Sequence, residues 1–232
     1  KDGHWAKNLW VSGEPYWPGI QLGETAIPLL LADLLRREGA LSEEELARLW
    51  PTVRKAASYI VRHGPSTQEE RWENARGYNA YTLGALIAAL LIAAEAAERR
   101  GEEREAAFLR ETADCWYSSI DEWTYVEGTR LARRVGVRGY YLRIAPPDRR
   151  GEPVKFDDNL EFWYRGTGFK RDYPPASVVS PDALAYVRFG LRAPDDPRVV
   201  DTMKVIDAIT KVETPYGPAW HRYNHDGYGG KL

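Results

Sequence analysis

A tryptophan–glutamate pair is the feature of this 232-residue sequence that most directly suggests chemistry. Glu73 follows Trp72 in a polar stretch, shortly before the most apolar segment of the chain. Cleavage of a glycosidic bond needs a carboxylic acid that is still protonated near neutral pH, and burial beside an indole raises the pKa of a glutamate by desolvation. Glu73 is therefore a candidate general acid. The alternative is a carboxylate in the first turn of a helix, where the helix macrodipole favours negative charge.

Two other segments share this character, with aromatic residues flanking polar ones next to a helix. They are residues 15–22 (PYWPGIQL) and residues 220–228 (WHRYNHDGY). Aromatic rings can stack on the apolar faces of sugars, while amide, carboxylate and guanidinium groups can hydrogen-bond hydroxyl groups. If these loops gather at one end of a helical domain, they form a pocket for a neutral polyhydroxylated ligand. The alternative is that the nine tryptophans and 14 tyrosines simply fill a core.

The composition argues against several other functions. A net charge of −2 gives no global reason to bind nucleic acid or an acidic membrane surface. No apolar run approaches the ~20 residues that span a bilayer. The sequence shows no glycine-rich phosphate loop, no Cys/His metal cluster and no nucleophile elbow, so we expect no cofactor. Calcium binding by Asp157, Asp158 and Glu161 is an alternative to the favoured interpretation, a solvated acidic loop.

Hydrophobic periodicity predicts the helices that must position these loops. They cover residues 24–38, 43–62, 80–99, 102–122, 181–191 and 197–211. Ser42 and Glu45 form a capping-box signature for the second helix, and Pro51 is expected to kink or split that helix. Cys115 lies in the apolar phase of the fourth helix, which predicts a buried, inert thiol.

The remaining segments predict strands and loops. Residues 138–145 alternate like a strand and predict a hairpin with residues 124–136. Residues 146–179 and 213–232 are rich in Pro and Gly and are expected to be loops. Helices in pairs, separated by long loops, predict an all-α fold of the α/α-toroid type with a small β-hairpin excursion.

The order of these segments resembles glycoside hydrolase family 15, and within it the bacterial glucoamylases and glucodextranase. The matching stretches run along essentially the whole chain and include KDGHWAKNLW, GEPYWPGIQL, QEERWE, GYNAYTL, EWTYVEGTRLARR, VSPDALAYVRFGLR and KVETPYGPAWHRYNHDGYG. The resemblance implies an (α/α)6 barrel, with residues 1–232 forming part of one catalytic domain. It also implies an exo-acting, inverting hydrolase that releases β-glucose from the non-reducing ends of α-glucans.

The resemblance implies that Glu73 is the general acid and that Trp72 lines its pocket. Asn74 stands where the family usually has a second carboxylate, so contact with the sugar of the leaving group is expected to be weaker.

Four further positions match substrate-binding loops of the family. Trp17 and Gln21 match the loop that covers the sugar at the non-reducing end. Arg222 and Asp226 match a loop whose arginine contacts substrate, with the aspartate chiefly its structural partner.

Inversion also requires a general base, a second carboxylate roughly 6.5–9.5 Å from the acid. The resemblance implies that this base lies beyond the DGYG stretch, outside the chain, and that the chain holds about half of the barrel's helices. We therefore expect the chain to be inactive alone, and to associate with the remainder of the catalytic domain or with itself through exposed apolar faces. The parent protein is expected to be extracellular.

Two other functions stay open. The chain could be a non-catalytic carbohydrate-binding or scaffold module that keeps the aromatic pocket. It could also belong to another (α/α)6 enzyme, such as a trehalase or a phosphorylase, although no basic cluster suggests a phosphate site. The sequence does not choose between α-1,6 and α-1,4 linkages.

Overall fold

The computed structural model describes residues 2–147, 160–163 and 170–226, with only the backbone described for 160–163 and 170–172. The chain divides into two compact units. Unit 1 comprises Lys1–Arg71 and Thr82–Ser119, and unit 2 comprises Trp72–Tyr81 and Ile120–Leu232. The candidate acid segment therefore belongs to unit 2, although it lies between two stretches of unit 1 in the sequence.

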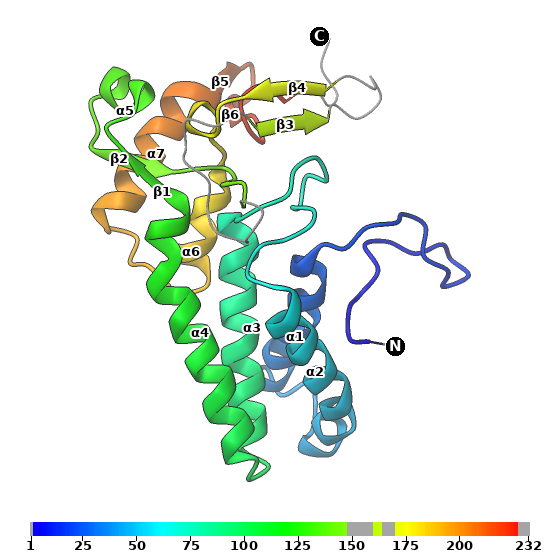
Figure 1. Cartoon of the computed structure of the whole chain (residues 1–232). Helices are drawn as coiled ribbons and strands as arrows, with labels where there is room; N and C mark the ends of the chain where they lie inside the picture. The colour runs from blue at the N-terminus through cyan, green and yellow to red at the C-terminus, as the bar shows by residue number, and fades with distance from the viewer. Residues whose placement is uncertain (1, 148–159, 164–169, 227–232) are drawn as a thin grey trace. The chain divides into compact units, whose positions relative to one another are not determined.

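Unit 1 is helical. Its elements are α1 (Leu22–Arg37), α2 (Glu43–His63) and most of α3 (Ala80–Glu98) and α4 (Glu103–Thr124) (Figure 1). Helices α1 and α2 pack against each other through small and branched apolar side chains at helical spacing. These buried residues are Leu22, Ala26, Leu29, Ala56, Ala57 and Ile60. All four helices agree with the predicted segments to within three residues at each end.

Helix α3 has apolar residues on every side, as expected for a helix that the fold buries on most sides. Leu83, Leu86 and Leu90 are 0% exposed, and Ile87 is 1% exposed. By length and composition alone α3 could cross a membrane, contrary to the expectation that no apolar run approached that length. However, 67% of its apolar window is buried inside the protein, as in the central helix of a folded domain.

The start of α2 confirms the predicted capping box. The Ser42 hydroxyl accepts a hydrogen bond from the Glu45 amide at 3.3 Å, and the Glu45 carboxylate accepts one from the Ser42 amide at 2.8 Å. The prediction that Pro51 could split this helix is wrong, because α2 continues to His63. Pro51 has no N–H, so the carbonyl one turn earlier lacks its helical hydrogen bond. Because Pro51 is on an exposed face, water can bind that carbonyl instead.

The prediction of a buried Cys115 is also wrong, because the thiol is exposed. Ala113 and Trp116 face the core, with exposures of 1% and 7%. Cys115 lies about 200° around the helix from Ala113, which places it on the opposite side.

A hairpin follows α4 in unit 2. Strand β1 (Tyr125–Glu127) pairs antiparallel with β2 (Gly139–Tyr141), and Val126 lies opposite Tyr140. Between them lies α5 (Arg130–Val135), a short helix that the periodicity did not predict. The Thr129 hydroxyl caps the start of α5, and Gly136 ends the helix in the left-handed conformation. The connection between the two strands is therefore a short helix rather than a simple turn.

Two further hairpins occupy segments that were predicted to be loops. Strand β3 (Leu160–Trp163) pairs with β4 (Lys170–Tyr173), and β5 (Lys211–Thr214) pairs with β6 (Gly217–Trp220). The β5–β6 turn uses Gly217 at φ 112°, a conformation that glycine adopts without strain.

Short helices and one longer helix complete unit 2. A 3₁₀ turn η1 (Pro175–Ser177) precedes η2 (Pro181–Ala183), which leads directly into α6 (Leu184–Arg188). The Ser180 hydroxyl accepts a hydrogen bond from the Asp182 amide and so caps the start of η2. Helix α7 (Pro197–Thr210) matches the last predicted helix to one residue.

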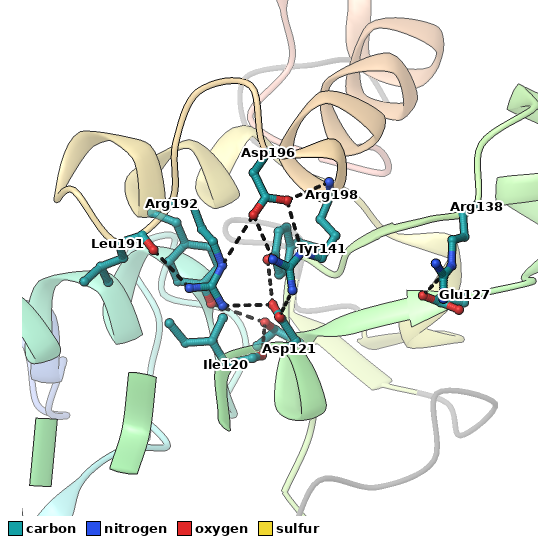
Figure 2. A network of polar contacts seen from close by, with 11 residues as sticks. Ile120, Asp121, Glu127, Arg138, Tyr141, Leu191, Arg192, Asp196 and Arg198 are labelled. Carbon is teal, nitrogen blue, oxygen red and sulfur yellow. Dashed lines mark hydrogen bonds and ion pairs between the residues drawn. The ribbon is translucent and has the colours of Figure 1, made fainter. Parts of the chain in front are cut away.

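An ion-pair network joins several elements of unit 2 (Figure 2). Asp121 of α4 accepts hydrogen bonds from the Tyr141 hydroxyl at 2.6 Å, from Arg192 Nη2 at 3.2 Å, and from Arg198. Arg198 also pairs with Asp196 at 2.8 Å, and these hydrogen bonds hold the pKa of Asp196 below its usual range. The contribution of Asp196 to the stability of the fold is therefore fully present at pH values above the ordinary aspartate pKa. It is lost as the pH falls from there through the lowered pKa of Asp196.

We expect Asp121→Asn to lower the free energy of unfolding by about 2 kcal/mol, because it removes the charge that compensates Arg192 and Arg198. The Arg192 side chain is only 8% exposed, so water screens it poorly. The matched control is Glu127→Gln, whose partner Arg138 is 79% exposed. That change should cost less than about 0.5 kcal/mol. Urea unfolding followed by tryptophan fluorescence measures both, and equal effects would contradict the assignment.

Candidate active site

The segment that carries Glu73 is fastened to the chain that follows β2. Tyr78 and Ala145 form an antiparallel bridge, with N–O distances of 2.8 and 2.9 Å. Gly77 approaches this bridge so closely that a β-carbon on it would lie 2.3 Å from the Ala145 carbonyl oxygen. The buried Asn79 side chain adds a bond to the Arg143 carbonyl oxygen at 2.9 Å. The segment is thus held at its C-terminal end by backbone and side-chain contacts.

Glu73 has a left-handed backbone conformation, with φ of 61°. Few residues other than glycine adopt this conformation, and it persists only where surrounding contacts impose it. The contacts next to it come from Asn74. Its amide nitrogen donates to the Tyr223 hydroxyl at 2.5 Å, and its amide oxygen accepts from Arg143 Nη2 at 2.5 Å. Glu73 itself is half-buried.

Tyr223 and Arg143 form the buried support of this loop. Arg143 is 0% exposed and Tyr223 is 3% exposed. The guanidinium carbon lies 3.9 Å from the centre of the tyrosine ring, which is a cation–π contact. Burial raises the pKa of Tyr223, so its hydroxyl stays protonated at neutral pH.

Arg222 and Asp226 form a bidentate ion pair. The distances are 2.5 Å from Nε to Oδ2 and 2.6 Å from Nη2 to Oδ1. The Asp226 side chain is 7% exposed, so the pair is partly screened from water. The Arg222 guanidinium carbon also lies 4.9 Å from the centre of the Trp72 ring. This contact connects the 222–226 loop to the segment of the candidate acid.

A small apolar cluster lies beneath these groups. Ala75, Ile144, Val178 and Tyr223 form its buried part, and Trp72 and Tyr173 pack against it. Within unit 2, the structure therefore brings together all five of the expected site residues of that unit: Trp72, Glu73, Asn74, Arg222 and Asp226.

The other two expected site residues, Trp17 and Gln21, lie in unit 1. Trp17 follows a tight loop closed by a bridge between Leu9 and Pro15. It is 40% exposed and its ring lies 4.8 Å from that of Tyr16. Gln21 is 5% exposed and occupies the N-cap position of α1.

Among the residues that the structure describes, no group of three or more His, Cys, Asp or Glu is placed to hold a metal ion. Asp157 and Asp158, the suggested calcium ligands, lie outside the described residues, as does the side chain of Glu161.

The sequence reasoning missed Arg143 and Tyr223. Arg143 interrupts the apolar stretch YYLRIA, and a charge inside a strand pattern is the signal that could have marked it. Tyr223 lies in the motif of residues 220–228, but the charged Arg222 and Asp226 are the stronger candidates there from sequence alone. Both residues face the loop of Glu73 from segments far away in the sequence.

A helical chain that places a carboxylate, an indole and an arginine–aspartate pair in adjoining loops has the residue types of a carbohydrate-active protein. The family model of glycosyl hydrolases family 15 matches residues 3–232. The chain belongs to this family.

Individual relatives agree with this assignment. A glucoamylase of Clostridium sp. (strain G0005) is 40% identical over 223 residues, 96% of this chain and 29% of the relative. An uncharacterized glycosyl hydrolase of Methanocaldococcus jannaschii is 33% identical over 91 residues, 38% of this chain and 15% of the relative. A bacterial glucoamylase crystallised with acarbose matches with a TM-score of 0.82 and 38% identity, over 98% of this chain and 31% of that one.

The structural match confirms the predicted fold class, which is part of the glucoamylase (α/α)6 barrel. The chain spans less than a third of the length of these glucoamylases.

We expect Gly77→Ala to lower the free energy of unfolding by about 2 kcal/mol or more, because the residue has φ of 141° and its β-carbon would clash with Ala145. Gly136→Ala is the matched control: φ there is 79°, but nothing lies within 4 Å of the added carbon. The control should cost about 1 kcal/mol. Urea unfolding compares the two, and an equal loss would show that the close approach at the bridge is unimportant.

Proposed function

We propose that this chain carries the general acid of an exo-acting, inverting α-glucan hydrolase, and that Glu73 is that acid. The observation that carries the proposal is the placement of Glu73. It has a strained backbone and lies between an anchored Asn74 and Trp72, whose ring is in contact with the Arg222 guanidinium. Strained residues with well-fixed neighbours cluster at active sites.

In the proposed reaction, Glu73 donates its proton to the glycosidic oxygen as the bond to the anomeric carbon breaks. Water attacks the opposite face of the sugar, which inverts the configuration and yields β-glucose. Arg222, oriented by Asp226, donates hydrogen bonds to sugar hydroxyls, and Trp72 contributes an apolar wall. Trp17 and Gln21 are proposed as sugar-binding residues of unit 1.

The general base of this reaction is proposed to come from a part of the catalytic domain outside these 232 residues. Exposed apolar residues support such a partner, because Ile27, Leu31 and Leu34 line one side of α1 with exposures of 37%, 51% and 47%. The remainder of the domain, or a second copy of the chain, is proposed to cover this stripe. Release of β-glucose by the 232 residues alone, at the rate of the complete gene product, would refute an external base.

The proposed substrate is an α-glucan or its oligosaccharides, in an extracellular protein. The supporting comparison is the bacterial glucoamylase crystallised with acarbose. Parallel assays with dextran and with starch oligosaccharides measure the preference between α-1,6 and α-1,4 linkages. A preference for trehalose over both would instead favour a trehalase.

The prediction that tests the acid is Glu73→Gln in the complete product of the reading frame. The amide keeps the shape of the side chain but cannot donate the proton, so kcat should fall by at least about 100-fold. The Kd for a glucan oligosaccharide should change little, because the proton is needed only in the transition state. Proton NMR of the anomeric signals follows β-glucose release, and calorimetry measures binding.

Glu213→Gln is the control, because Glu213 has a 73% exposed side chain on β5 and should leave kcat unchanged. An unaltered kcat in Glu73→Gln would refute the acid assignment. Sugar binding without hydrolysis by the unmodified protein would instead identify a binding module.

A further inference from the structure

Arg143 is the largest side chain that is fully buried among the described residues, with 0% exposure. Arginine is almost never buried completely unless its charge is compensated, because removing a charge from water is costly. A leucine or methionine would fill the same space without that cost. The presence of a cation here therefore calls for a reason other than packing.

The guanidinium of Arg143 contacts two loops of the candidate site at once. Nη2 donates to Asn74 Oδ1 at 2.5 Å, and the guanidinium carbon lies 3.9 Å from the centre of the Tyr223 ring. Asn74 in turn donates to the Tyr223 hydroxyl at 2.5 Å. The three side chains form a closed triangle, with Arg143 and Tyr223 buried and Asn74 half-buried, and hydrogen bonds in such networks strengthen one another.

The backbone of Arg143 is itself fixed. Its amide donates to the Val178 carbonyl at 3.3 Å, and its carbonyl accepts from Asn79 Nδ2 at 2.9 Å. Asn79 also donates to the Asp182 carboxylate at 3.0 Å. The guanidinium therefore projects from a rigid base, two residues before the bridge between Ala145 and Tyr78. A rigid base allows the arginine to define the position of Asn74 rather than follow it.

We propose that Arg143 is a positioning residue for the reaction, acting through Asn74 to hold Glu73 in its left-handed conformation. The backbone of Glu73 at φ 61° is strained, so it relaxes unless the following residue is held in place. Relaxation rotates the carboxyl group away from the place where it meets the glycosidic oxygen. The inference rests on the proposed role of Glu73 as the acid.

The experiment measures kcat and KM for Arg143→Lys, Arg143→Met, Asn74→Ala and the double variant Arg143→Met/Asn74→Ala, in the complete product of the reading frame with a maltooligosaccharide. Each single variant should lower kcat by about 10- to 100-fold, because small misplacements of a reacting group have effects of that size. Arg143 is 0% exposed and so should not contact the sugar, and KM in its variants should change by less than about threefold. The double variant should be no slower than the slower single variant, because both changes release the same anchor.

Arg192→Met is the matched control. Arg192 is a second buried arginine of unit 2, with 8% side-chain exposure, and belongs to the Asp121 network. Its loss should lower the melting temperature but leave kcat per folded molecule unchanged. If Arg143→Met does not fold, Arg143→Lys and Asn74→Ala still test the proposal, because the first keeps the buried charge and the second changes a half-buried residue.

Two results would overturn the inference. One is a kcat within twofold of the unmodified protein for both Arg143→Lys and Asn74→Ala. The other is a double variant whose loss of kcat/KM equals the sum of the two single losses in free energy, together with a raised KM in Asn74→Ala. That result would mean that Asn74 binds sugar independently of Arg143. Glu73→Gln separates these results from failure of the proposed function: if it is inactive while the Arg143 variants are normal, only the positioning role fails.

Discussion

The pairing of Tyr78 with Ala145 is the constraint on which the candidate site depends. This short bridge joins the segment of Glu73 to the chain leaving β2, although the two are far apart in sequence. Gly77 is required for the close approach, and Asn79 extends the contact to the Arg143 carbonyl. With the bridge in place, the Arg143 side chain is directed at Asn74. Without it, the candidate acid and its support would belong to separate loops.

Unit 2 contains two arginine-centred networks that differ in character. The Asp121 network pairs cations with carboxylates and joins α4, β2 and the start of α7, so its effect is on stability. The Arg143 network uses an amide and an aromatic ring, which orient the guanidinium. These contacts fix the position of the guanidinium relative to Asn74, which suits the proposed positioning of Glu73.

The sequence allowed the long helices to be predicted well, because each has a consistent apolar face and clear end signals. The segment around Glu73 was also recognisable, since a Trp–Glu pair and its family motif are local features. Other features depend on tertiary contacts. Helix α5 is too short for periodicity to reveal it, and its ends are set by Thr129 and Gly136. The contact of Arg143 with Asn74 joins residues 69 positions apart, which no local pattern encodes. The exposed Cys115 shows that an error of half a turn in phase reverses a burial prediction.

The left-handed backbone at Glu73 has a consequence for how this position can change over time. Glycine or asparagine would adopt φ of 61° more easily than glutamate, so either residue would relieve strain there. A lineage that no longer depended on the carboxyl group would gain stability by drifting to one of them. On the proposed role of Glu73, a glutamate at this position gives up some folding stability in exchange for a carboxyl group that can do chemistry.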